Sequence, residues 1–93
     1  MTGRIDVASG ENLAEQLRAG APPVVTAVLT RPEAATEAAL VGAVVAAVAA
    51  ERAPEVRVNA VLIGDGASEA DVAAATVFLA GAEAVTGQVL DIG

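Results

Sequence analysis

Apolar blocks recur along this chain at intervals that predict strands. Residues 24–29 and 56–63 are nearly all apolar and rich in β-branched side chains, which is typical of strands buried on both faces of a parallel sheet. Shorter runs at residues 4–8 and 88–92 predict two more strands. The block at 56–63 follows a long alanine-rich segment and ends in a Gly-Asp-Gly turn, so we expect it to be the central strand.

Helical patterns fill the three intervals between these strands. Each interval opens with side chains suited to cap a helix and closes with residues that end one. The expected starts are Ser9, the capping-box pair Thr30 and Glu33, and the pair Ser68 and Asp71; the expected ends are Gly20, Arg52 and Gly81. The order βαβαβαβ predicts an α/β domain over residues 1–93, with about four parallel strands and three crossover helices.

The second helix carries a broad apolar stripe, which we interpret first as its core-facing side. The stripe consists of Leu40, Val41, Val44, Val45 and Val48. Gly42 lies beside it, where a bare backbone would admit a closely packed neighbour. In the third helix, the residues expected toward the core are Val72, Thr76, Val77, Leu79 and Ala80.

Charge and composition narrow the classes of partner. The chain has 12 acidic and 5 basic residues, a net charge of −7, and its only aromatic residue is one Phe. An acidic surface without aromatic platforms is poorly suited to nucleic acid, and it disfavours anionic membranes. Because Cys and His are absent, disulfides and thiolate or imidazole metal ligands are excluded. The carboxylates are scattered, so we expect no metal site.

The apolar segments of the sequence indicate neither a signal peptide for export nor a membrane-spanning helix. The first residues lack the apolar core of a signal peptide. The uninterrupted apolar run at 38–50 is shorter than the roughly 20 residues of a spanning helix. We therefore expect a soluble protein of the cytoplasm.

The C-terminal half resembles a short-chain dehydrogenase/reductase, in particular the 3-oxoacyl-carrier-protein-reductase-like members. Residues 38–42 and 49–54 are similar to that family's long helix, and residues 56–61 to the strand that follows it. Residues 71–80 and 86–93 are similar to its last helix and strand, and residues 3–7 more weakly to its fourth strand. The resemblance implies a small Rossmann-like half domain that lacks the family's N-terminal nucleotide-binding half.

The departures from the family pattern concern its chemistry. The resemblance places the family's catalytic Tyr and Lys at Glu33 and Glu37, and Thr30 near its catalytic Ser. The whole chain contains neither Tyr nor Lys, and no glycine-rich cofactor turn lies near its start. We therefore expect no catalytic residues, no bound cofactor and no metal.

Other polar residues have both a functional and a structural interpretation. Glu33 and Glu37 at i, i+4 spacing suit either an acid/base pair or a solvated first helical turn. The Gly-Asp-Gly segment at 64–66 suits a ligand loop or, more simply, a tight turn. We expect Asn59 to be a satisfied structural amide and Arg57 to pair with a carboxylate. Ser9 and Ser68 are interpreted as helix caps.

Association is the function that these observations favour. The long helix is similar to one that packs between subunits in the family, and the last helix and strand to a second subunit contact. The candidate association face is Leu40, Val41, Val44, Val45, Val48, Phe78 and Val89. Only three helices are available to cover both sheet faces, and the first strand has a free edge, so we expect another chain to cover these surfaces.

The predicted function is thus a non-catalytic dehydrogenase-like module that forms a homo-oligomer, or a hetero-oligomer with an intact reductase. The alternative is a shortened NAD(P)-dependent oxidoreductase subunit whose active site a partner chain completes. A relic without a function of its own is the third possibility.

Overall fold

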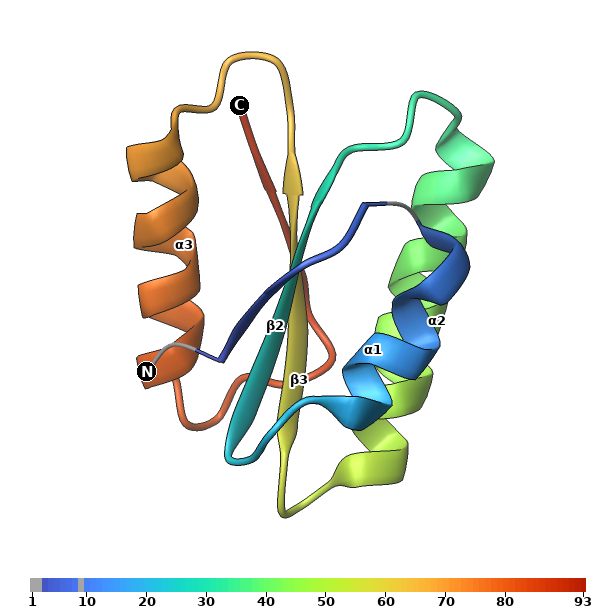
Figure 1. The fold of residues 1–93 in the computed structure, drawn as a ribbon, viewed down its shortest axis with the longest axis vertical. Helices are drawn as coiled ribbons and strands as arrows, with labels where there is room; N and C mark the ends of the chain where they lie inside the picture. Colours follow the sequence, from blue (N-terminus) through green and yellow to red (C-terminus); the bar gives the residue numbers. More distant parts are fainter. Residues whose placement is uncertain (1–2, 9) are drawn as a thin grey trace.

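A computed structural model describes residues 3–8 and 10–93 and confirms the α/β architecture (Figure 1). The described residues form one parallel sheet in the order β1-β2-β3-β4. The strands are β1 (Arg4–Asp6), β2 (Val24–Thr30), β3 (Arg57–Ile63) and β4 (Val89–Ile92). The helices are α1 (Leu13–Ala19), which follows the 3-10 turn η1 (Gly10–Asn12), then α2 (Ala35–Arg52) and α3 (Glu69–Gly81). This is a Rossmann-like half fold.

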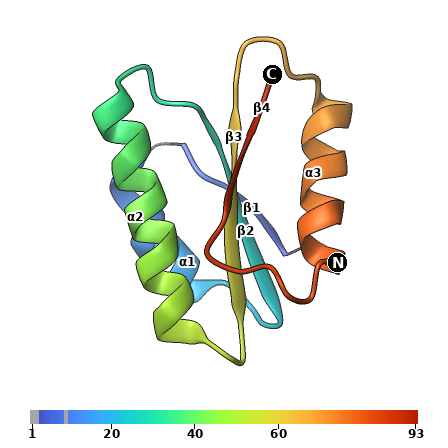
Figure 2. The same cartoon turned by 180° about the vertical axis from the view of Figure 1, so that it is seen from behind.

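The sheet lies between two helical layers. Helices α1 and α2 cover one face, and α3 alone covers the other (Figures 1 and 2). Successive side chains of a strand point to opposite faces, so Ala27 belongs to the α1/α2 core and Val28 to the α3 core. Both cores consist mainly of Val, Leu and Ala, as the composition predicts.

The chain's own helices bury both faces of the central strands. Every residue from Val24 to Leu29 and from Val58 to Leu62 is buried. The expectation that another chain must cover the sheet faces is therefore wrong. Small side chains allow the helices to approach the sheet closely, and one helix suffices for the narrow α3 face. The free edges remain, on the short strands β1 and β4.

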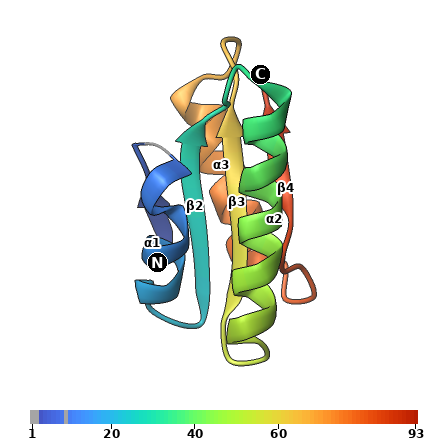
Figure 3. The same cartoon turned by 90° about the vertical axis from the view of Figure 1, so that its right-hand side faces the viewer.

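The crossover through α3 has the opposite hand to the other two. All strands are parallel and succeed one another in chain order across the sheet. Helices α1 and α2 lie on the face that makes their crossovers right-handed, whereas α3 lies behind the sheet (Figure 3). The β3-α3-β4 connection is consequently left-handed. Only about 2% of crossover connections between parallel strands have this hand.

Polar side chains of β3 hold α3 and the following loop in this arrangement. The Arg57 guanidinium donates to the carbonyl oxygens of Leu79, Ala80 and Ala82 at 2.6–3.0 Å. The expected pairing of Arg57 with a carboxylate is thus wrong, because the unpaired carbonyls at the end of a helix attract a cation equally well. Asn59 is a satisfied amide, as predicted: its Nδ2 donates to the Val85 carbonyl at 3.1 Å, and its Oδ1 accepts from the Gln88 N–H at 3.0 Å.

The helix starts differ in how well the sequence predicts them. The capping box of α3 is confirmed: Ser68 Oγ accepts from the Asp71 N–H at 3.1 Å, and Asp71 Oδ2 accepts from the Ser68 N–H at 3.0 Å. Ser9, the expected cap of the first helix, lies outside the described residues. Helix α1 itself begins at Leu13.

The capping box predicted at Thr30 and Glu33 is wrong. Thr30 is still paired with Ile63 in the sheet, and the Arg31 N–H donates to the Ile63 carbonyl at 2.9 Å. Pro32 also favours an extended conformation at the preceding residue. Helix α2 therefore begins only at Ala35, after an N-cap, Ala34, that makes no side-chain hydrogen bond.

Two glycines are expected to respond oppositely to alanine substitution. A Cβ at Gly20 would lie 2.5 and 2.7 Å from the Val25 methyl groups and 3.2 Å from Ile5 Cδ1. A Cβ at Gly42 would meet nothing within 4 Å. Gly20→Ala should lower the free energy of unfolding by about 1–3 kcal/mol through overpacking, and Gly42→Ala should raise it by up to about 1 kcal/mol through helix propensity. Urea denaturation of both variants checks this, and equal effects would contradict the packing.

Candidate functional site

The outer face of α2 is the largest uncharged stretch of helix surface. No charged residue occurs between Glu37 and Glu51. The exposed positions in between include Ala39, Leu40, Ala43, Ala46, Ala47 and Ala50. Residues 39, 43, 46 and 50 alternate at spacings of four and three, the spacing of a helix–helix seam. Helix α2 is therefore apolar on its solvent side as well as toward the core, which is typical of a helix with a second packing partner.

The predicted stripe is divided between the core and this outer face. Val41, Val45 and Val48 are buried against the sheet, as the core interpretation requires. Val44 is half-buried and packs at the margin of the core. Leu40, in contrast, is 65% exposed, so its assignment to the core is wrong. Because α2 is apolar all round from residue 38 to residue 50, it has no amphipathic pattern from which the buried and exposed sides could be distinguished.

The remaining residues of the predicted association face lie elsewhere. Phe78 is 59% exposed and Val77 60% exposed on α3, on the opposite side of the sheet from α2 (Figure 2). Val77 therefore does not face the core, as was expected of it. Val89 is half-buried in β4 and packs against the α1/α2 core. Three of the seven predicted residues are thus buried in the core, and the other four lie on α2, α3 and β4, so the seven do not form one surface patch.

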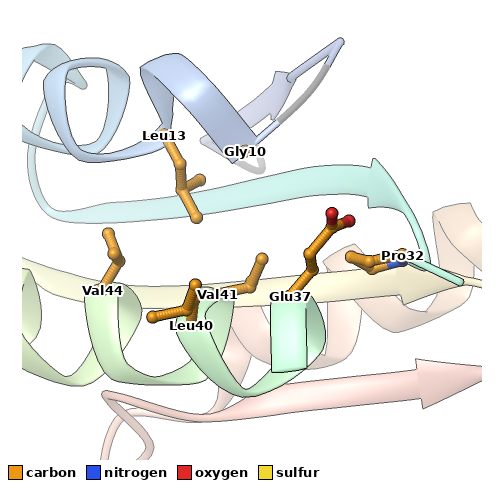
Figure 4. A pocket seen from close by; sticks show the side chains of 7 residues that line it. All are labelled: Gly10, Leu13, Pro32, Glu37, Leu40, Val41 and Val44. Atoms are coloured by element: carbon orange, nitrogen blue, oxygen red, sulfur yellow. The ribbon is translucent and has the colours of Figure 1, made fainter. Parts of the chain in front are cut away.

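A groove of about 550 Å³ separates α1 from the first turns of α2. Its walls come from η1, α1, the β2–α2 loop and α2, and its lining residues are Gly10, Leu13, Pro32, Glu37, Leu40, Val41 and Val44. Figure 4 shows Leu13 pointing into the groove from α1 and the Glu37 side chain rising into it from α2. The sequence alone did not indicate this groove, because it depends on how α1 packs beside α2.

The two glutamates of the proposed acid/base pair are not on one helix face. Glu33 precedes α2 by two residues, and Glu37 lies in its first turn and lines the groove. Their predicted i, i+4 arrangement on a helix is wrong for the same reason as the Thr30 cap. The solvated first turn applies to Glu37 alone.

The Gly-Asp-Gly segment at 64–66 forms a tight turn, closed by a 3.2 Å hydrogen bond from the Ala67 N–H to the Gly64 carbonyl. The space beside Gly64 is already occupied. A Cβ there would lie 2.7 Å from Arg31 Nη1 and 2.9 Å from the Gly93 carbonyl oxygen. A ligand approaching Gly64 closely would meet the same atoms.

All five arginines make contacts inside the chain. Arg4 pairs with Asp6 and Glu69, Arg18 with Glu51, and Arg31 with Asp91. Arg57 caps α3, and Arg52 Nη1 donates to the carbonyls of Leu17 and Gly20 at 2.7 and 2.8 Å, which caps α1. Since the chain has no Lys or His, its whole positive side-chain charge is committed to these contacts.

Over residues 3–8 and 10–93, no three metal-ligating side chains gather into a site. The same described residues contain no helix with the length and hydropathy needed to cross a membrane.

The family model described as "SDR-like: Short chain dehydrogenase-like protein" matches residues 6–92. No curated protein matches the chain.

Hydrogen bonds lower the pKa of two carboxyl groups. The pKa of Asp71 lies below its ordinary value of 3.8, chiefly because the Ser68 backbone N–H donates to its carboxylate. The pKa of Glu51 lies below its ordinary value of 4.5, chiefly because the Arg18 side chain donates two hydrogen bonds to it, at 2.9 and 3.0 Å. Both carboxylates therefore favour the folded state when they are ionised.

We expect stability to fall in acid. A carboxyl group with a lowered pKa stabilises the fold fully above its unfolded-state pKa, and this contribution disappears as the pH falls through the folded-state value. The free energy of unfolding should thus decline from about pH 4.5 downward. Glu51→Gln should flatten the decline, whereas Glu83→Gln, at a position without an ion pair among the described residues, should not. Urea denaturation at a series of pH values between 7 and 3 gives the free energy of unfolding of each variant. If this free energy declined with falling pH equally steeply in both variants, the prediction would be contradicted.

Proposed function

The chain belongs to the short-chain dehydrogenase-like family, whose model matches residues 6–92, and we propose that it acts as a non-catalytic association module of that family. The observation that supports this is the outer face of α2. Contiguous apolar surface on a small domain usually marks a contact with another macromolecule. Here Leu40, 65% exposed, lines a groove and belongs to a helix that carries no charge over residues 38–50.

The absence of catalysis is proposed from the residues at the matching positions. The resemblance places the phenol and the ammonium of the family's reaction at Glu33 and Glu37. A reduction with NAD(P)H needs a proton donor that stays protonated near neutral pH, and a carboxylic acid does not. No other position can replace them with the same chemistry, because Tyr and Lys are absent from the sequence.

The enzyme alternative, an NAD(P)-dependent subunit completed by a partner chain, has less support. A dinucleotide carries a pyrophosphate, which proteins hold with backbone N–H groups and cations. Each of the five arginines is already paired or caps a helix. A partner chain would have to supply the whole of the phosphate site.

Substitution of one exposed apolar residue on α2 and one on α3 should show which of the two helices forms the association contact. In light scattering at micromolar concentration, we expect the wild-type chain to associate with itself or with an intact reductase of the family. Leu40→Glu should weaken that association by at least about tenfold, since a buried anchor of an interface contributes ~1.4 kcal/mol or more. Phe78→Glu, a matched change at 59% exposure on α3, should have a much smaller effect.

Both variants should keep the circular dichroism spectrum and thermal melt of the wild type, because both side chains are exposed. A chain that stays monomeric alone and in the mixture would refute association. Loss of the complex in Phe78→Glu but not in Leu40→Glu would show that the contact lies on α3, which would contradict the assignment to α2.

Cofactor binding provides an independent test. We expect an NADPH titration followed by ¹H–¹⁵N NMR to leave the resonances of Gly64 and Glu37 unchanged, and the chain to reduce no carbonyl substrate. The titration is then repeated with the intact reductase present. Shifts in this chain's signals that require both the reductase and NADPH would favour the enzyme alternative.

A further inference from the structure

The groove beside α2 contains a carboxylate without a cation. Among the lining residues whose side chains the structure describes, Glu37 alone is ionisable, and the others are Leu, Val, Pro and Gly. Within the described residues, Glu37 takes part in no ion pair. The positive end of α2 offsets part of its charge, but its oxygens still lack a charged donor. A ligand that covered the apolar walls without bringing a donor would desolvate this carboxylate at a cost.

A second copy of the chain is a poor source of that donor. It has no Lys or His, and all five of its arginines are held in internal contacts. Arg18 is the arginine with the most exposed side chain among those in ion pairs, at 53%, but it forms a two-point contact with Glu51. Two copies would also bring net charges of −7 together, which opposes their approach.

The shape of the surface favours a helix over a small molecule. The groove lies between two helices, and it adjoins the outer face of α2, which stays uncharged to residue 50. From residue 37 to residue 50, that face extends about 20 Å at 1.5 Å per residue. A small amine would fill the groove and leave Ala43 and Ala47, which flank Leu40 on α2, exposed, whereas a helix lying along this side of α2 would cover the groove and both alanines.

We propose that this surface receives an amphipathic helix from a different, more basic protein. One aliphatic or aromatic side chain of that helix enters the groove between Leu13 and Val44, and a Lys or Arg about one turn away pairs with Glu37. This inference rests on the proposed association function and specifies the partner: it is a chain with free cations, and it is not a second copy.

Three synthetic helical peptides of about five turns test the inference. They share an alanine-rich sequence with one Leu anchor, and they differ only at the positions four residues before and after it, which are Lys, Gln or Glu. Each peptide is titrated into the ¹⁵N-labelled full chain and followed by NMR. We expect the Lys peptide to shift the resonances of Glu37, Leu40 and Val44 and to bind about three- to fivefold more tightly than the Gln peptide, as for a partly exposed ion pair. The Glu peptide should bind most weakly.

Variants of the chain assign the preference to one carboxylate. Glu37→Gln should abolish the difference between the Lys and Gln peptides, and Glu37→Arg should reverse the order so that the Glu peptide binds best. Glu83→Gln removes the same charge in the loop between α3 and β4 and should leave the order unchanged. Leu40→Ala should weaken binding of all three peptides alike.

The outcomes separate this inference from the proposed function. No shift at these residues up to about 1 mM peptide, or equal affinity for all three, overturns the cationic helix. If the chain forms a dimer that Leu40→Glu disrupts and the Lys peptide does not compete with it, the association function stands and the partner is a second copy. If the chain also fails to associate with itself and with the reductase, both proposals are wrong.

Discussion

The arrangement of the molecule depends on two polar side chains of the central strand. Arg57 and Asn59 are in β3, which is buried on both sides by apolar neighbours. The Arg57 guanidinium satisfies three carbonyls at the end of α3, and the Asn59 amide holds the loop that leads into β4. Because each of these groups would be costly to leave unpaired, together they determine where α3 ends and where β4 begins. Both side chains bind segments on the α3 side of the sheet, which is the face opposite to α2.

These contacts, together with the ion pairs, engage all five arginines of the chain. Arg52 does for α1 what Arg57 does for α3, and the other three arginines join segments that are distant in sequence, such as Arg18 and Glu51. The carboxylates outnumber the arginines by seven, so the remaining surface charge is acidic. The apolar surface that remains lies on the outsides of α2 and α3, because the sheet faces are already closed. The acidic surface therefore follows from the use of the arginines in internal contacts, and the uncharged helix faces are the apolar surface that remains after the sheet is covered.

Prediction from the sequence succeeded where the cause of a structure is local. Continuous β-branched runs predicted β2 and β3, and the Ser68–Asp71 pair predicted the start of α3, because the atoms that form the capping box lie within one turn. It failed where a distant partner decides. Thr30 has the spacing of a cap, but its pairing with Ile63 extends β2 and delays α2. The acceptors of Arg57 are backbone carbonyls, which any sequence possesses.

The candidate site was hard to predict for the same physical reason. A helix with Val on one side and Ala on the other has little contrast between its faces, so Leu40 was grouped with core residues although it is exposed. The groove exists only because α1 packs beside α2, a contact between segments that are separated in sequence by a strand. Charge patterning indicated an acidic protein, but it did not reveal that every arginine is engaged within the fold.

The charge at position 37 links the family resemblance to the groove. The resemblance places at this position the family's ammonium, which helps to hold an anionic dinucleotide; here the position carries a carboxylate at the edge of an apolar groove. Reversing the sign at a fixed position reverses the ligand that electrostatics favours there, from an anion to a cation. Since the same helix also presents uncharged, exposed alanines, the cation that suits this surface best is a Lys or Arg side chain on a helix of similar length. In the proposed recognition of another protein, Glu37 is therefore the residue that distinguishes the preferred ligand of this surface from the family's dinucleotide.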